Sequence, residues 1–180
     1  MHSQHTLRLV FSGLMQAWGR DGAILRRPVY REPSKSGVVG LICAAMGVER
    51  GDAAAITKLA ALEMVVFTVR EGHLYDDYHT VAHHAQCDLR SADGKAMTNA
   101  IQTQREYLVD AKFEVFLGSE DKASLETIAA AIRNPCWFLY LGRKNCAPNA
   151  PIIQEPYLFD GDPRTVVRQR MEAAALEHAE

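Results

Sequence analysis

TLRLVFS, at residues 6–12, is the stretch that decides the fold. Every second residue from position 7 is a large apolar one, which is the period of a half-buried β-strand. Two further stretches share this β-branched and aromatic composition, MVVFTVR at residues 64–70 and KFEVFLG at residues 112–118. The pattern therefore predicts three strands, and we expect a short fourth strand at residues 137–141.

Helical patterns lie between these strands. The run SGVVGLICAAMG is apolar on all sides and predicts a buried helix that begins at Ser36 as N-cap and ends at Gly47. Asp52 is the expected N-cap of a short second helix. Leucine and isoleucine recur at helical spacing over residues 125–132, before an Asn-Pro stop.

The order of elements is βαβ, a long polar insertion, and βαβ again. This order predicts an α+β protein with a ferredoxin-like, or RRM-like, βαββαβ fold. We expect residues 1–180 to form a single domain. Asp162 and Pro163 supply an N-cap and a first-turn residue, so a short C-terminal helix is predicted at residues 163–179.

The overall composition gives no general attraction to nucleic acid. The formal net charge is −2, but the first 36 residues hold six basic residues against two acidic ones. The four cysteines are widely spaced without a CxxC pair, which is typical of a reduced cytoplasmic protein. No apolar run approaches the roughly 18 residues that cross a bilayer, so a membrane role has no support.

The aromatic signature of RNA-recognition motifs is absent from the third strand. Glu114 stands where that signature has an aromatic or small residue. RNA binding by bases stacked on the sheet is therefore disfavoured. We expect loops to carry any RNA contacts.

Three loops carry candidate ligands for RNA. In the first, residues 13–19, Trp18 is either a platform for a stacked base or a packing anchor. In the second, residues 33–37, Lys35 and Ser36 open the buried helix, where N–H groups and the helix dipole favour phosphate. This loop is not a Walker P-loop, and a plain N-cap at Ser36 with a solvated Lys35 is the alternative.

The third loop, residues 141–146, places two adjacent cations after a glycine. Glycine lets a phosphate approach the backbone, and Arg143 is able to bind a phosphate through two N–H groups. Lys144 adds a second positive charge.

The polar insertion contains a possible metal site. If the stretch were helical, His79, His83 and Cys87 would share one face at a spacing that suits zinc, with Asp76 as a fourth ligand. The segment has little helical amphipathicity, so the favoured interpretation is a loop with solvated histidines, His84 included, and no metal or other cofactor.

Several segments in order resemble the CasD family of type I-E Cascade complexes, within the RAMP superfamily of CRISPR proteins. The matching segments are LMQAWG (14–19), RPVYREPSKSGVVGL (27–41), DYHT (77–80), QTQREYLVDAKFEV (102–115) and LGRKNCAPNAP (141–151). The resemblance runs from about residue 7 to residue 151.

The resemblance implies a ferredoxin-like domain with an inserted β-hairpin thumb at residues 75–103. It implies a non-catalytic subunit of the ribonucleoprotein complex that binds the 5′ handle of the CRISPR RNA and caps the backbone filament in antiviral defence. The implied partners are the backbone subunit CasC, the large subunit CasA and, through guide pairing, target DNA. The residues in shared motifs, expected to contact RNA, are Gln16, Trp18, Arg27, Lys35, Ser36, His79, Arg105, Tyr107, Arg143 and Lys144.

An alternative function is a metal-independent endoribonuclease that processes CRISPR precursor RNA, as type I-C relatives are thought to do. Tyr107, Lys144 and His79 would suit attack by a 2′-hydroxyl, with His79 as general base and Lys144 stabilising charge. The motifs are of the type I-E kind, in which a separate subunit, CasE, performs that cleavage. The resemblance therefore favours a protein that is not an enzyme.

Overall fold

The computed structural model describes residues 4–20, 25–81, 90, 93–96 and 100–177. Its main sheet is antiparallel and has the strand order β4-β7-β1-β8, formed by β4 (Glu63–Arg70), β7 (Lys112–Ser119), β1 (His5–Ser12) and β8 (Leu158–Asp160). The three long strands predicted from their composition are confirmed. The strands pair so that apolar residues stand opposite each other, for example Leu9 of β1 opposite Val115 of β7.

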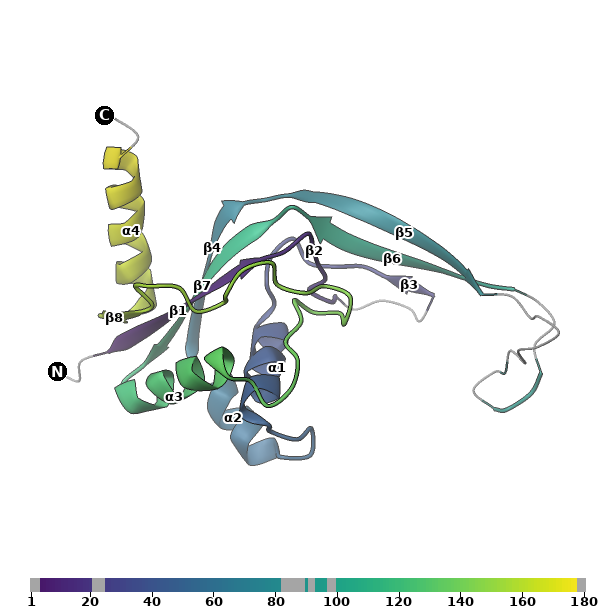
Figure 1. Ribbon diagram of the computed structural model, residues 1–180, viewed down its shortest axis with the longest axis horizontal. Helices are drawn as coiled ribbons and strands as arrows, with labels where there is room; N and C mark the ends of the chain where they lie inside the picture. Colours follow the sequence, from purple (N-terminus) through teal and green to yellow (C-terminus); the bar gives the residue numbers. More distant parts are fainter. Residues whose placement is uncertain (1–3, 21–24, 82–89, 91–92, 97–99, 178–180) are drawn as a thin grey trace.

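Three helices cover one face of this sheet and a fourth lies on the other (Figure 1). The covering helices are α1 (Lys35–Met46), α2 (Ala53–Ala60) and α3 (Lys122–Arg133), and α4 (Pro163–Glu177) stands opposite them. In the core, Leu9 and Phe11 of β1 are fully buried with Ile42 of α1 and Leu125 of α3. The described helices are too short and polar to cross a membrane.

Helix α1 begins two residues earlier than expected. Ser34, not Ser36, is the N-cap, and its side chain accepts a hydrogen bond from the Gly37 N–H. The end is as predicted, because Gly47 adopts the left-handed conformation and closes the helix. Asp52 caps α2, which confirms that prediction.

The predicted fourth strand at residues 137–141 is wrong, because this segment is irregular. The start of this segment is hydrogen-bonded to α1 instead, since the N–H groups of Cys136 and Trp137 donate to the carbonyls of Ala45 and Ala44 near the end of that helix. The edge of β1 is filled by β8 and by the irregular chain before it. In that chain Ile152 and Tyr157 accept hydrogen bonds from the backbone of β1.

The polar insertion forms a long β-hairpin that projects from the body (Figure 1). It consists of β5 (His73–Val81) and β6 (Ile101–Val109), paired antiparallel along their whole described length. Two short strands also pair with β6, namely β2 (Met15–Gln16) antiparallel and β3 (Arg26–Arg27) parallel. These pairings join the base of the hairpin to the N-terminal third of the chain.

A sharp corner separates the hairpin from the main sheet. Gly72 has φ +66°, and a Cβ there would lie 2.4 Å from the Val109 carbonyl oxygen. Asp110 on the other strand has φ +58°, and its carbonyl and carboxylate both accept hydrogen bonds of 2.6 Å from Arg70. The corner therefore requires glycine at position 72.

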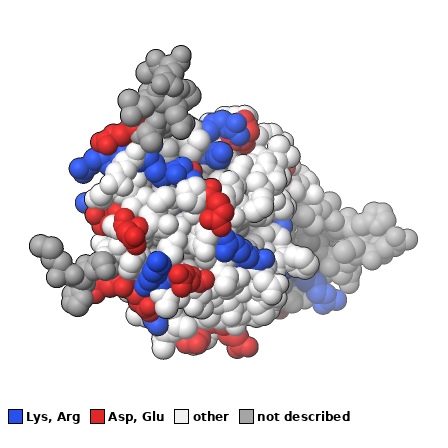
Figure 2. All heavy atoms as spheres, turned by 60° about the vertical axis from the view of Figure 1, so that its left-hand side comes forward, with Lys and Arg blue, Asp and Glu red and all other residues white. Residues whose placement is uncertain are grey.

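The second face of the sheet holds a buried ion cluster. Arg8 donates to Glu114 at 2.9 Å, and Arg170 of α4 donates to both carboxylate oxygens of Glu114 at 3.1 Å. Burial lowers the pKa of Arg8, and the charge of Glu114 opposes this effect. On the surface of the side that Figure 2 brings forward, basic and acidic side chains are interspersed. A helix and an ion cluster thus occupy the face that RNA-recognition motifs use for bases.

Candidate nucleic-acid interface

The structure brings the three predicted loops together around one cavity of about 560 Å³. We call it the basic groove, and its lining residues are Ala17, Trp18, Gly19, Arg20, Arg27, Pro28, Ser34, Ser36, Gly37, Gly142 and Arg143. The side chains of Arg20 and Arg27 are exposed, and Ser36 is exposed in the first turn of α1. The N-terminal end of α1 adds the positive end of the helix dipole.

Trp18 is a packing anchor in this structure. Its ring is only 1% exposed and lies 5.3 Å from the ring centroid of Phe11. Gln16 is fully buried and accepts a 2.9 Å hydrogen bond from the Trp18 indole N–H. Both side chains are buried, so in this structure they hold the loop in place. Their direct contact with RNA stays a prediction.

Lys35 points away from the basic groove. Its ammonium group donates to the carbonyl oxygen of Leu62, which precedes β4. Burial lowers the pKa of Lys35, although nearby Glu63 acts in the opposite direction. Lys35 and Lys144 instead line a second and larger cavity beside α1. The sequence grouped both lysines with the phosphate site, and the structure separates them from it.

Arg143 connects its own loop to β3 and to β6. Its guanidinium donates to the carbonyl of Glu106 at 2.8 Å and to the carbonyl of Arg27 at 2.9 Å. The same group lies 4.7 Å from the ring centroid of Tyr107. Tyr107 is itself buried, and its hydroxyl accepts a hydrogen bond from Asn145. Arg143 is therefore a positioning residue for this groove, and Tyr107 is not accessible to a base.

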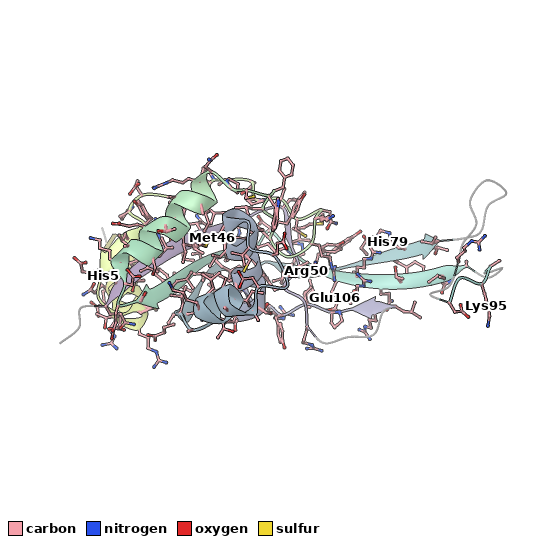
Figure 3. The ribbon with its side chains drawn as sticks, turned by 90° about the horizontal axis from the view of Figure 1, so that it is seen from below. His5, Met46, Arg50, His79, Lys95 and Glu106 are labelled. Carbon is pink, nitrogen blue, oxygen red and sulfur yellow. The ribbon has the colours of Figure 1, made fainter. Side chains whose placement is uncertain are left out.

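His79 and Arg105 lie on one face of the hairpin. Arg105 is directly opposite Asp77, and His79 is opposite Thr103 and hydrogen-bonded to the Asp77 carboxylate. The Nε atom of Arg105 is buried without a hydrogen-bond partner among the described residues. Figure 3 shows His79 far out along the hairpin, away from the end of α1 at Met46. These residues therefore form a second group, separate from the loops.

The zinc hypothesis required a helix around His79, and the structure has a strand there. Asp76 and His79 consequently point to opposite faces of β5. His83, His84 and Cys87 lie outside the described residues. Within the described ranges, no group of three metal-ligating side chains comes together.

Two groove features were not among the predicted contact residues. Arg20 lines the cavity directly, and its only signal in the sequence is its membership of the basic cluster in the first 36 residues. Glu106 fixes the chain around β3, because its carboxylate accepts a hydrogen bond from the Val29 N–H at 3.2 Å and lies 3.6 Å from the Arg26 guanidinium. No local sequence pattern marks Glu106 for this role.

Comparison with known proteins identifies the family. A sequence model of the family described as CRISPR-associated protein (Cas_Cas5) matches residues 6–178. The chain belongs to this Cas5 family of CRISPR-associated proteins. The resemblance found from the sequence motifs is thereby confirmed.

Individual relatives are similar over most of the chain. The CRISPR system Cascade subunit CasD of Escherichia coli strain K12 is 36% identical over 166 residues, which cover 85% of this chain and 70% of that protein. A chain in a solved CRISPR RNA-guided surveillance complex matches with a TM-score of 0.73 at 31% identity, over 84% of this chain and 65% of that chain. A crystal structure of a Cas protein matches with a TM-score of 0.68 at 31% identity, over 90% of this chain and 69% of the other.

Gly142 provides a test of the groove's construction. It has φ +98°, and a Cβ at this position would lie 1.9 Å from the Ala17 carbonyl oxygen. Gly142→Ala is expected to destabilise the protein by about 2 kcal/mol or more, because backbone must move and the strained conformation remains. Urea unfolding measures this change. Gly51→Ala is the matched control, because a Cβ there meets no neighbour within 4 Å, and an equal loss in both variants would contradict the prediction.

Proposed function

We propose that this chain is the CasD-type subunit of a type I-E Cascade complex and that its basic groove holds the 5′ handle of the CRISPR RNA. The observation that carries the proposal is the convergence of the three motif-bearing loops on one cavity with Arg20 and Arg27 at its border. A single-stranded backbone suits such a site, since exposed arginines and glycine backbone both accommodate phosphate. The 36% identity to a Cascade subunit supports the same role.

The fold supports this assignment at a finer level. When the four main-sheet strands are numbered along the chain, their spatial order is second, third, first, fourth, with α1 and α3 on one face. We infer that this is the ferredoxin-like βαββαβ arrangement and that residues 1–180 act as a single domain. Residues 75–103 of the hairpin are then the thumb.

In this proposal the guide sequence, and not this subunit, reads the target DNA by base pairing. The subunit would act in the cytoplasm, contact the backbone subunit CasC through its hairpin and lie beside the large subunit CasA. It needs no metal or other cofactor for these tasks.

We also propose that the chain is not a nuclease. Tyr107 is buried and hydrogen-bonded to Asn145, while Lys144 lines the larger cavity beside α1. Tyr107 pairs with Tyr75, and His79 lies four residues further along β5, about 13 Å at the rise of a strand. A general base must come within about 3 Å of the proton that it abstracts, so this separation argues against a shared active site.

Handle binding is expected to depend on salt through the groove arginines. Arg20→Ala and Arg27→Ala should each weaken binding of a handle oligonucleotide and reduce the slope of log K against log salt by about 0.7, the value for one single-strand phosphate contact. Fluorescence anisotropy at several salt concentrations measures both quantities. Arg164→Ala is the control, since this side chain is exposed on α4. Unchanged slopes in the two groove variants would exclude the basic groove as the phosphate site.

A repeat-containing precursor RNA is expected to remain uncut when incubated with the purified protein, with or without divalent metal. The physical reason is the separation of His79 from Tyr107 along the hairpin. Denaturing gel electrophoresis measures the outcome. Specific cleavage that His79→Ala abolishes and a chelator does not would establish the nuclease alternative.

Shortening the hairpin tests its role in assembly. Tyr78 and Gln104 are directly opposite each other, so an Asn-Gly turn replacing residues 79–103 closes the hairpin without changing its base. The variant is expected to fold and to bind handle RNA, and to be absent from complexes formed with the backbone subunit. Size-exclusion chromatography of the co-expressed subunits measures incorporation, and normal incorporation would show that the hairpin is not the thumb.

A further inference from the structure

One face of the hairpin carries a group of side chains that lies outside the basic groove. Residues 75, 77 and 79 of β5 project from the same side of the hairpin, because side chains alternate along a strand. Their partners on β6 are residues 107, 105 and 103. We call this surface the hairpin face and define it by Tyr75, Asp77, His79, Thr103 and Arg105.

The hairpin face continues the basic groove through β3. Arg27 of β3 is directly opposite Arg105 in parallel register, so their side chains project from the same side of the sheet. Arg27 and Arg143 both line the basic groove, and the Arg143 guanidinium lies 4.7 Å from the ring centroid of Tyr107, which also projects from this side. An RNA strand that leaves the groove past these two arginines would therefore meet the hairpin face next.

Tyr75 is an exposed aromatic side chain beside this exit. It is 52% exposed, whereas its cross-strand partner Tyr107 is only 1% exposed. The Tyr75 ring therefore contributes little to the core. An exposed aromatic ring next to a cationic groove is the usual platform on which proteins stack an unpaired base.

The polar side chains of the hairpin face favour a base over a phosphate as the ligand. Asp77 is the next residue after Tyr75 on this face, and its carboxylate repels phosphate but accepts hydrogen bonds from the N–H groups of a base. His79 is hydrogen-bonded to Oδ2 of this carboxylate, which leaves Oδ1 to face a ligand.

Arg105 supplies a donor directly opposite that acceptor. Its Nε has no hydrogen-bond partner among the described residues, whereas Arg143 uses its donors on the carbonyls of Glu106 and Arg27. An acceptor and a donor thus stand side by side on neighbouring strands, close enough to meet one ligand. The edge of a nucleobase presents the complementary pair of groups. A protein partner is disfavoured, because Tyr75 is the one large apolar side chain in this group.

We propose that the hairpin face binds one unpaired nucleobase of the handle RNA, which stacks on Tyr75 and forms hydrogen bonds to Asp77 and Arg105. His79 is a positioning residue that orients the Asp77 carboxylate. This inference rests on the proposed function and deepens it, since it assigns phosphates to the basic groove and a base to the hairpin face.

Substitution of Tyr75 tests the stacking. In the full chain, Tyr75→Ala is expected to weaken binding of a handle RNA oligonucleotide by about tenfold or more and to leave the slope of log K against log salt unchanged, because no phosphate contact is lost. Tyr75→Phe keeps the ring and should bind as the unchanged chain does. Fluorescence anisotropy measures both quantities. Tyr78→Ala is the matched control, since it removes a ring that is 56% exposed on the opposite face of β5. Full affinity of Tyr75→Ala, or an equal loss in the two alanine variants, would overturn the proposal.

Removal of the charge at Asp77 distinguishes a base from a phosphate. Asp77→Asn should weaken handle binding by about fivefold, because a charge-assisted hydrogen bond to the base becomes a neutral one. A phosphate would instead bind more tightly once the negative charge is gone, so a gain in affinity would contradict the proposal. Asp76→Asn is the matched control, because it removes the same charge from the opposite face of β5 and should leave the affinity unchanged.

Abasic handle oligonucleotides test the same contact from the RNA side. At one position, removal of the base should cost the unchanged chain about tenfold in affinity and cost Tyr75→Ala little more, since both changes remove one contact. Additive losses at every position would show that no base lies on Tyr75. In that case a loss of affinity in the Arg20 and Arg27 variants would leave the handle function standing. If even the unchanged chain bound no handle RNA, the proposed function itself would fail.

Discussion

Contact between the Trp18 ring and Gly37 sets the position of the basic groove. The ring lies against Phe11 of the core on one side, and only the absence of a Cβ at Gly37 lets it lie this close to α1. Gln16 fixes the indole N–H and also donates to the Phe11 and Ala111 carbonyls. The first loop is thereby attached to the sheet, to the corner of the hairpin and to the start of α1 at once.

The cations near the basic groove differ in their exposure and contacts. Arg143 and Lys35 use their N–H groups on backbone carbonyls, so they join segments of the chain. Arg20 and Arg27 are exposed at the border of the groove. Under the proposed function, a chain with a net charge of −2 would offer a local polyanion site because folding concentrates a few arginines at one cavity.

Helix α1 separates two surfaces of different chemistry. Its first turn borders the basic groove, and its small residues Gly40 and Ala44 line the larger cavity together with Trp137 and Phe138. On the opposite side of the sheet, Arg8, Glu114 and Arg170 attach α4 and leave no face for stacked bases. The hairpin adds a third surface, which the corner at Gly72 directs away from the body. This arrangement suits a subunit that contacts RNA and proteins simultaneously.

The sequence by itself determined the long strands β1, β4 and β7, the helices and the family, because alternation, helical spacing, caps and ordered motifs are local properties. It did not determine the fourth strand, since Trp137 bonds to α1 while residues 158–160 pair with β1. It also could not distinguish a buried Trp18 from a stacking platform, or Arg143 as a positioning residue from a phosphate ligand. Those roles depend on contacts between separate segments, Trp18 with Gly37 and Arg143 with the carbonyls of Glu106 and Arg27, which only the tertiary structure forms.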